Sequence, residues 1–518
     1  MPKYLKDLRL PDYIAIGLLL IYLLIGFHFV GDYGVNWDDW PQRLNGYNNW
    51  EFITGHDLQP LKASSDKYHG PAVEILLIAV EKAFRLIDNH DIYLARHRTV
   101  FILFVLSVGV FFLLCRKLFN SPWLALTAML LLVLTPRIFG EAFYNPKDTT
   151  FLAAMILVLY SLYIFCEKPT FPHAIFHAFA CAFAIDIRVI GILFIPITFV
   201  LIAVNLRQGK LSLTGLWKKL MTYIIAEVAL MVMMWPILIL NPWVHLWSAY
   251  KQLSNYVLWD GYNKYMGDFF RASKTPWHYH WVWMLITLPE VYILFFIAGV
   301  CLLAYNFQKK GFLQNTKNSF LLLSIILFLF PLVFRSIKGS IVLDGWRHVY
   351  FVYPFFLIVA IYAIEQLILL KYKIFKVVAY AALSIAMLDS AIQIVQMHPF
   401  EYVYFNHTAR AIFKPIDQKF EMDYWGVSYK QGLEYLLTHK QGKEKIKVAF
   451  QNVPGNANYD FLCPAQKEQI LVSDISQAEY LLTNYRDFDY APPRPAAGQL
   501  VYLYQAQGNA VMGIHKLR

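Results

Sequence analysis

Long apolar segments separated by short polar loops occupy most of the first 397 residues, and Ile14–Val30 and Phe151–Phe165 are among the clearest. A helix needs about 20 apolar residues to cross the hydrocarbon core of a bilayer. By this rule the pattern predicts about eleven membrane spans in a mainly α-helical transmembrane bundle. They fall near residues 12–30, 99–115, 121–138, 148–166, 172–187, 189–206, 218–240, 281–304, 318–334, 347–369 and 374–396.

The segment Pro71–Ile87 is long enough for another span, but it includes charged residues such as Glu74 and Glu81. Its apolar residues recur at helical spacing, which indicates an amphipathic helix at the membrane surface. Counting it as a span would also reverse the sides of the following loops. Residues 31–98 are therefore predicted to form one long outer loop that contains a juxtamembrane helix.

Residues 172–206 are too long for one helix and are interrupted only by Asp186 and Arg188. We interpret them as two short helices with these charges at the outer turn. A single tilted span with a buried ion pair is the alternative.

The apolar runs stop after Gln396, which divides the chain into a membrane domain (1–397) and a C-terminal domain (398–518). The C-terminal domain is predicted to contain a helix at Tyr429–His439 and a strand at Ile446–Val453. Leu500–Ala506 and Ala510–Lys516 then suggest a hairpin. The pattern predicts a small α/β domain within the usual size range of an independently folding unit.

Composition agrees with a membrane protein, because 58% of the residues are hydrophobic and only 16% are charged, with a mean hydropathy of +0.43. Soluble domains usually have about a quarter charged residues. The net charge of +11 is mostly accounted for by loop lysines and arginines. It is attributed to membrane topology and does not indicate nucleic-acid binding.

The distribution of Lys and Arg between alternate loops orients the spans, because cytoplasmic loops are the basic ones. Basic clusters occur at the N-terminus, at Arg116-Lys117, at Lys168, and within 207–219, 309–317 and 371–376. This places the N-terminus in the cytoplasm and the C-terminal domain on the outer (periplasmic) side of the inner, or plasma, membrane. The first span is predicted to be retained, since no small-residue cleavage site follows it.

Ionisable residues gather in the predicted outer loops, whereas the inner loops hold basic residues and very few acids. The outer residues are Asp38, Asp39, His69, Arg96, Arg98, Lys147, Asp148, Asp186, Arg188, Arg347 and His348. Transporters tend to place such groups near the midplane of the membrane. Charges at one surface instead favour an enzyme acting at the outer leaflet.

Asp38 and Asp39 are flanked by Trp37 and Trp40 just after the first span. Adjacent carboxylates in an extended chain point in opposite directions, so one of the two is expected to face a pocket. A carboxylate near cations and aromatic surface can act as a general base. A solvated loop acid or a helix cap is the alternative.

Asp148 opens a later span, where it also satisfies free amides of the first helical turn. Lys147 beside it is an outer cation, contrary to the positive-inside trend, and is a candidate for binding an anion. Arg96, Arg188 and Arg347 provide paired donors suited to phosphate. Contact with lipid headgroups is the alternative for the arginines.

These residues resemble the integral-membrane glycosyltransferases of the GT-C fold, in the branch of protein O-mannosyltransferases and lipid A aminoarabinose transferases. The resemblance rests on the acidic pair after the first helix, the juxtamembrane helix, the later outer-loop acid and the Arg-aromatic start of a late span. The family usually has Asp-Glu where this chain has Asp38-Asp39. It often has Lys-Pro-Pro where this chain has His69-Gly70-Pro71, and its lysine contacts donor phosphate.

The resemblance implies catalytic roles for Asp38, Asp39 and Asp148, with Asp38 as the base. It implies that His69 and Arg96 occupy substrate- or phosphate-binding positions. Lys147, Arg188, Arg347 and His348 are substrate- or phosphate-binding candidates from their own chemistry and location.

The predicted activity is transfer of a hexosyl or pentosyl group to an acceptor hydroxyl on the outer side, with inversion of configuration. Nucleotide sugars are cytoplasmic, so the donor is expected to be a polyprenyl-phosphate sugar. The acceptor is a protein, a glycolipid or a polysaccharide. No cofactor or metal is expected, because the outer histidines and acids lack ligand spacing and the five cysteines have no metal-ligand pattern.

Two other classes of function fit the spans. A transporter or flippase for a lipid-linked sugar would keep its activity when Asp38 is neutralised. A non-catalytic envelope assembly factor would tolerate neutral substitutions of Asp38, Asp148 and Arg347 alike.

Overall fold

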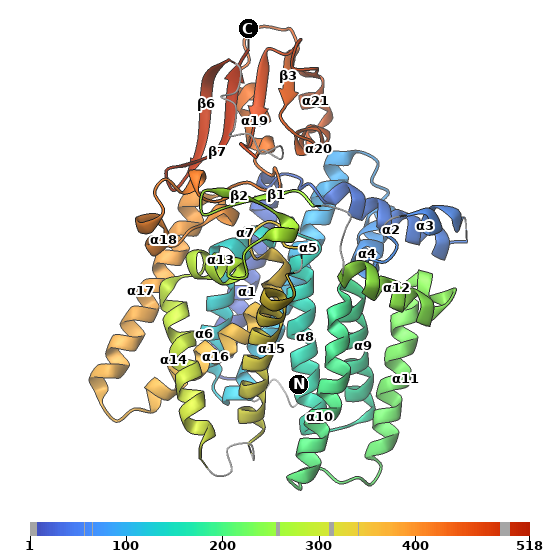
Figure 1. The fold of residues 1–518 in the computed structure, drawn as a ribbon, viewed down its shortest axis with the longest axis vertical. Coiled ribbons are helices and arrows are strands. Elements are labelled where there is room, and N and C mark those ends of the chain that lie inside the picture. Colours follow the sequence, from blue (N-terminus) through green and yellow to red (C-terminus); the bar gives the residue numbers. More distant parts are fainter. Residues whose placement is uncertain are drawn as a thin grey trace.

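The computed structural model describes residues 8–517 except residues 56, 65, 255–259, 310–314, 340 and 487–497. A bundle of long helices carries a small sheet domain at one end (Figure 1). Within these described ranges, eight helices are long and apolar enough to cross a membrane. They include α1 (Leu10–Phe29), α5 (Asn89–Phe119), α8 (Asp148–Glu167), α10 (Phe194–Arg207), α14 (Glu290–Phe307), α15 (Thr316–Lys338), α16 (Tyr353–Leu369) and α17 (Lys373–Met397).

Three further helices account for the remaining predicted spans. They are α6 (Pro122–Val133), α9 (Phe171–Ile187) and α11 (Leu216–Met234). The predicted multi-span helical bundle is therefore confirmed. So is the division of residues 172–206, because α9 ends at Ile187 and a 3-10 turn (Val189–Leu193) leads into α10. The predicted basic loops at Arg116-Lys117 and at 371–376 lie at the end of the bundle opposite the sheet domain, whereas Lys3, Lys6 and Lys310 fall outside the described residues (Figure 1).

Three predicted spans end or break earlier than expected, and a proline follows each break. The span at 121–138 divides before Pro136, where the short helix α7 (Pro136–Glu141) begins. The span at 218–240 ends at Trp235 before Pro236, and the span at 281–304 divides before Pro289. Proline lacks the amide proton of a continuing helix and restricts the residue before it, so hydropathy alone overestimates these helices.

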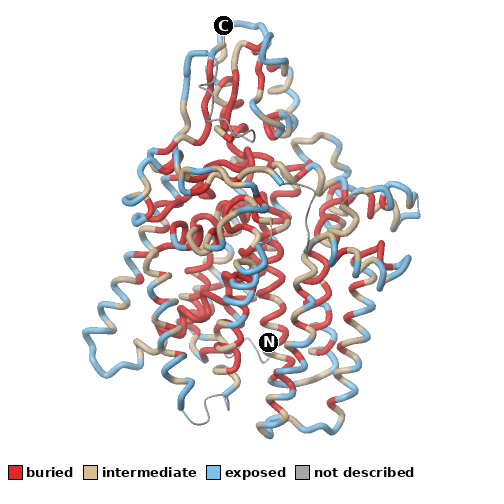
Figure 2. The backbone as a smooth tube through the Cα atoms, viewed as in Figure 1, coloured by how far each residue is buried: buried red, intermediate tan, exposed pale blue. Residues whose placement is uncertain are grey.

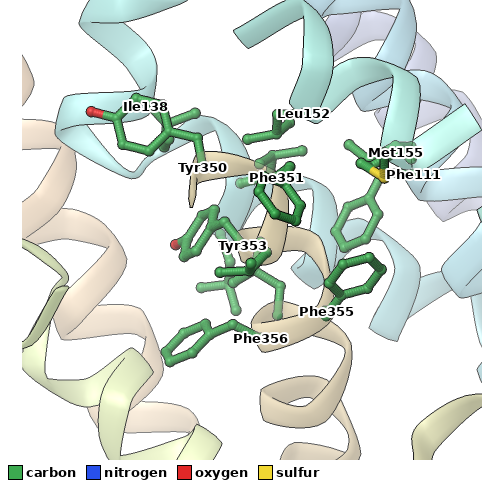
Figure 3. Close-up of a cluster of buried hydrophobic side chains, with 14 of the residues drawn as sticks. Phe111, Ile138, Leu152, Met155, Tyr350, Phe351, Tyr353, Phe355 and Phe356 are labelled. Atoms are coloured by element: carbon green, nitrogen blue, oxygen red, sulfur yellow. The ribbon is translucent and has the colours of Figure 1, made fainter. Parts of the chain in front are cut away.

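The most buried helices are the ones that reach the charged end of the bundle. The spans at Asp148–Glu167 and Arg347–Leu369 are buried over 78% and 72% of their apolar windows, compared with 22% for the first span. Peripheral α11, α14 and α17 expose apolar side chains, as expected for surfaces facing lipid (Figure 2). Figure 3 draws the aromatic core around α8 and α16, with Phe111, Ile138, Leu152, Met155, Tyr350, Phe351, Tyr353, Phe355 and Phe356 labelled.

Short elements surround the end of the bundle that lies next to the sheet domain. They are the helices α2 (Asp39–Ile53), α3 (Gln59–Ala63), α4 (Ala72–Ala83), α12 (Pro242–Ser254) and α13 (Tyr279–Thr287), and the hairpin of β1 (Tyr262–Tyr265) and β2 (Asp268–Arg271). Among them the chain pattern predicted α4, and α13 forms the first part of the span predicted at 281–304. The helix α2 escapes prediction because polar residues interrupt its apolar ones throughout.

The C-terminal domain contains a five-stranded sheet in the order β4-β3-β5-β7-β6. The predicted helix, first strand and final hairpin are confirmed, and two very short strands were missed. The elements are α19 (Tyr429–Thr438), β3 (Ile446–Phe450), α20 (Pro454–Phe461), α21 (Pro464–Lys467), β4 (Ile470–Val472), β5 (Tyr480–Thr483), β6 (Gln499–Ala506) and β7 (Asn509–Lys516).

Residues 398–428 connect α17 to the sheet domain and belong to the core of the membrane helices. Phe400, Phe405 and Trp425 are buried in the same cluster as α8 and α16, whereas the sheet has its own core beginning at Tyr429. We therefore propose a domain boundary near residue 428 instead of the predicted 397.

Candidate active site

Charged side chains from distant parts of the sequence meet at Arg347, at the start of the 3-10 turn that precedes α16. Its Nη1 lies 3.5 Å from Asp38 Oδ2 and 3.2 Å from Asp148 Oδ2, and its Nη2 lies 2.9 Å from Asp344 Oδ2. The guanidinium also lies 4.4 Å from the ring centre of Trp425. One planar cation thus connects three carboxylates.

Asp38 is the open member of this group, because its side chain is 35% exposed whereas that of Arg347 is 6% exposed. The Asp38 amide donates to Asn36 Oδ1 at 2.8 Å, which fixes the turn after the first span. Partial burial raises the pKa of the Asp38 carboxyl, and the charge of Arg347 opposes that shift. The site therefore contains an accessible carboxylate held beside a cation.

Asp39 lies in a different environment from its neighbour and is 1% exposed. Its Oδ2 accepts hydrogen bonds from the amide and the side chain of Asn36 at 3.2 Å and 3.0 Å. Burial raises the pKa of Asp39 to about 7, although the charge of Arg96 opposes the shift. The two adjacent acids therefore face different surroundings, and the expectation that one of them faces a pocket remains a prediction.

Arg96 does not join the group around Arg347. It is 2% exposed, and it pairs with Glu74 at 2.9 Å and with Glu81 at 3.2 Å. Glu81 also pairs with Arg43 of α2 at 2.9 Å. The acidic residues of α4 are therefore turned into the protein, contrary to the surface helix expected from the sequence. We reassign Arg96 from phosphate binding to holding α4 against α5.

Further cations lie on the other side of Asp148. Arg188 forms an ion pair with Asp148 Oδ1, and its side chain is 27% exposed. Lys147 makes no ion pair with its ammonium among the described residues, and burial lowers its pKa. His348 lies within the fields of Arg188, Arg335 and Arg347. These groups form a cationic surface, which Asp148 partly neutralises through its ion pairs with Arg188 and Arg347.

His69 lies at the margin of this surface. Its Nδ1 is 3.4 Å from Asp66 Oδ1, and burial lowers the pKa of the imidazole while Asp66 opposes that shift. The charges of Lys147 and Arg188 also reach His69. The structure therefore brings His69 near the predicted phosphate-binding cations but also provides it with an acidic partner.

The sequence analysis missed two residues of the Arg347 network. Asp344 joins Arg347 to Arg486, whose Nη2 lies 2.6 Å from Asp344 Oδ1. Arg486 lies shortly after the end of β5, so the C-terminal domain contributes a cation to this network. It also donates to the Tyr424 carbonyl. No local sequence pattern predicts this contact.

A second hydrogen-bond network that the sequence analysis missed, centred on Glu141, positions Asp148. Buried Glu141 accepts hydrogen bonds from Tyr350 and Tyr424, both at 2.6 Å. Glu141 also accepts from the side chain of Asn145 at 2.8 Å, and that amide lies 3.3 Å from Asp148 Oδ2. Burial raises the pKa of Glu141. The arrangement fixes the loop before α8 against residues of the C-terminal region.

A small apolar cleft lies on the membrane side of the cations. Its walls come from α8, the turn before α10, α15 and α16, and it is lined by Met155, Ile190, Leu193, Phe194, Leu327, Pro331, Phe351 and Phe355. Ile190 follows Arg188 by two residues, and Phe351 follows Arg347 by four. Apolar walls thus continue directly from the charged surface toward the bilayer.

No group of three or more His, Cys, Asp or Glu residues within the described ranges is arranged to hold a metal ion. The expected metal-independent reaction remains a prediction.

Residues 86–238 match the family described as dolichyl-phosphate-mannose-protein mannosyltransferase. The predicted resemblance to the GT-C membrane glycosyltransferases is confirmed. The match supports the predicted class of glycosyltransferase. It includes Arg96, Lys147, Asp148 and Arg188, whereas Asp38 and Arg347 lie outside it. Comparison with curated proteins gives no match.

Solved structures of membrane glycosyltransferases show a weak likeness to the chain. ArnT from Cupriavidus metallidurans bound to undecaprenyl phosphate is 13% identical, with a TM-score of 0.48 and coverage of 97% of each chain. The oligosaccharyltransferase of Archaeoglobus fulgidus is 11% identical, with a TM-score of 0.47 and coverage of 92% of this chain and 69% of that one. Arabinofuranosyltransferase AftD from Mycobacteria is 10% identical, with a TM-score of 0.40 and coverage of 96% and 41%.

Proposed function

We propose that this protein transfers a sugar from a polyprenyl-phosphate donor to an acceptor hydroxyl on the outer side of the membrane. The observation that carries the proposal is the position of Asp38. Its carboxylate is partly exposed and lies 3.5 Å from buried Arg347, next to a surface of cations. An accessible base beside an anion-binding surface suits direct displacement of a phosphate-linked sugar.

In the proposed reaction the Asp38 carboxylate takes the proton of the acceptor hydroxyl. The acceptor oxygen forms a bond to the anomeric carbon while the bond from that carbon to the lipid phosphate oxygen breaks. Attack from the face opposite the phosphate inverts the anomeric configuration. The electron pair of the broken bond remains on the phosphate, which needs little acid assistance as a leaving group.

Cations near Asp148 would stabilise the charge that develops on the departing lipid phosphate. Lys147 and Arg188 are the best-placed candidates, because Lys147 has no ion-pair partner among the described residues and Arg188 is partly exposed. Asp148 is 2% exposed and already accepts from Arg188, Arg347 and Asn145. Its proposed role is therefore to position these cations, while Asp38 acts as the base.

The apolar cleft below the cations supports a lipid-linked donor. Phosphate at the charged surface would place the lipid chain on the side of the apolar residues that line this small cleft, among them Phe351 and Phe355. A nucleotide sugar offers no apolar segment for this surface. The basic loops at the opposite end of the bundle support an outward orientation of the site.

The experiment uses purified protein in lipid discs and a panel of radiolabelled polyprenyl-phosphate hexoses and pentoses, with cell-envelope extract as the acceptor source. We expect the wild type to release or transfer sugar from one donor, with loss of turnover in folded Asp38→Asn. No turnover of any donor would contradict the proposal and favour a transporter or an assembly factor. Equal turnover by both proteins would retain the enzyme but exclude Asp38 as its base.

A further inference from the structure

A groove separates α2 from α3 on the outer face of the first loop, beside the proposed base. Trp40, Leu44 and Asn48 of α2 form one wall, and Pro60, Ala63 and Asp66 lie on the other. The empty space inside it is about 950 Å³ and includes open solvent. This is enough room for a sugar-sized group, and none of these residues takes part in the proposed donor site.

Trp40 gives the groove an exposed aromatic face, because its side chain is 61% exposed. Leu44, one helical turn later, is 42% exposed on the same wall. A large indole kept in water is unfavourable unless something covers it. Its position two residues after Asp38 places this apolar face next to the proposed reaction centre.

Asn48 supplies the polar counterpart to this surface. It is 8% exposed, lines the groove, and its side-chain amide makes no hydrogen bond within the described part of the chain. Because the side chain lines the groove, its amide stays accessible to water or to a bound molecule. An amide can both donate and accept, and the Asp66 carboxylate at the other end of the groove can accept. The groove therefore offers hydrogen bonding at points around an aromatic face.

We propose that this groove binds a pyranose ring of a glycan acceptor. One face of a pyranose consists mainly of C–H groups, and hydroxyls surround its rim. That distribution complements an exposed indole bordered by an amide and a carboxylate. An extended peptide is the less suitable occupant, since the helical backbones of α2 and α3 offer no strand edge for pairing.

The location of the groove connects this binding site to the proposed reaction. Trp40 follows Asp38 at one end, and at the other end the charge of Lys147 reaches Asp66. A sugar held here has its neighbouring hydroxyls near both the base and the cations. The inference rests on the proposed function for its role as acceptor site, but the binding of glycan does not require a donor.

The test measures binding directly. Fluorescently labelled protein in lipid discs is applied to an array of defined oligosaccharides, with the same headgroups also presented as glycolipids in vesicles. Wild type is compared with Trp40→Ala, Asn48→Ala and the control Trp243→Ala, which removes an exposed tryptophan of α12 outside the groove. We expect Trp40→Ala to weaken binding about tenfold and Asn48→Ala about fivefold, with Trp243→Ala unchanged.

Selective loss in Trp40→Ala and Asn48→Ala on either form of glycan supports the proposal. The form that binds identifies a polysaccharide or a glycolipid headgroup as the source. Equal binding by wild type and Trp40→Ala, no glycan binding, or binding only of Ser/Thr-rich peptides would overturn it. Glycan binding through Trp40 without turnover of any donor would instead contradict the proposed function and leave the groove assignment intact.

Discussion

Two charged clusters lie on opposite sides of the turn that contains Asp38 and Asp39, and they differ in access. The Arg347 cluster consists of Asp38, Asp148, Asp344, Arg188 and Arg347. The Arg96 cluster consists of Asp39, Glu74, Glu81, Arg43 and Arg96. Each contains three acids, but Arg486 adds a third arginine to the Arg347 cluster through Asp344, whereas the Arg96 cluster has two arginines.

The Arg96 cluster is closed, because Asp39 is 1% exposed and Arg96 is 2% exposed. The Arg347 cluster is open at Asp38, which is 35% exposed, and it adjoins further cations. Similar charges therefore serve different purposes. In the closed cluster they join α4 to its neighbours, whereas the open cluster leaves one carboxylate available for chemistry.

Conservative substitution of each central arginine gives the largest expected contrast. Arg347→Lys keeps the charge but cannot span three carboxylates, so we expect turnover to fall about a hundredfold. Arg96→Lys should leave turnover per folded molecule nearly unchanged and lower the free energy of unfolding by about 1–3 kcal/mol, because one carboxylate loses its buried partner. Donor turnover and thermal unfolding in lipid discs measure both. A loss of turnover in Arg96→Lys equal to that in Arg347→Lys would contradict the distinction between the clusters.

Removing a cation next to the open cluster should affect binding of the donor. Lys147→Ala is expected to raise the donor KM about tenfold with little change in kcat, because a phosphate contact of the ground state is lost. Lys82→Ala removes an exposed lysine of α4 and is the matched control. An unchanged KM in Lys147→Ala would remove this residue from the phosphate site.

The contact from the C-terminal domain should tune Asp38 through charge. The positive charge of Arg486 lowers the pKa of Asp38, opposing the effect of burial. Arg486→Gln is therefore expected to move the acid limb of the pH–rate profile to higher pH. Arg486→Lys keeps the charge and should leave the acid limb in place. The same shift in both variants would indicate a purely structural effect.

A charged group remote from both clusters should give a smaller effect, on stability alone. The charged imidazole of His398 donates to Asp32 Oδ2 at 2.9 Å and to Glu401 Oε1 at 2.8 Å. Burial disfavours its charged form, but these two carboxylates raise the pKa of His398 to about 9. The stabilisation is complete below the unfolded pKa, near 6.5, and is lost as pH rises through about 9.

We expect the free energy of unfolding to fall by about 1–2 kcal/mol between pH 6.5 and 9.5, since solvent screens this half-buried group. Thermal unfolding measures the fall, and His398→Gln should flatten it. Unchanged pH dependence in His398→Gln would assign the titration to another group. His398→Gln should leave turnover near neutral pH unchanged, because the proposed base is Asp38.

The sequence predicted the spans because each span is a local run of apolar residues. It predicted Asp38, Asp148, Arg188 and Arg347 as site candidates because ionisable residues gather in the predicted outer loops. The positions of Pro136, Pro236 and Pro289 would have corrected the helix ends. Hydropathy averages over a window and therefore conceals a single residue that ends a helix.

The assignment of Arg96 failed for a different reason. Glu74 and Glu81 resembled the polar face of a surface helix, and nothing in the spacing showed that Arg96 and Arg43 would cover that face. Arg486 was missed because its partner, Asp344, lies 142 positions earlier in the chain. Contacts of this kind depend on how the C-terminal sheet sits on the helices, which local periodicity does not encode.

We propose that the chemistry takes place at Asp38 and not at its neighbour Asp39. Single-turnover sugar transfer, measured at pH 7.5 in lipid discs with saturating donor, compares Asp38→Asn with Asp39→Asn. We predict that the transfer rate falls by at least about a thousandfold in Asp38→Asn, as expected for removal of a general base. We predict near wild-type rates in folded Asp39→Asn, because Asp39 is 1% exposed and an asparagine oxygen can accept the hydrogen bonds that Asn36 donates. Transfer by Asp38→Asn at the wild-type rate, or loss in Asp39→Asn alone, would contradict the account.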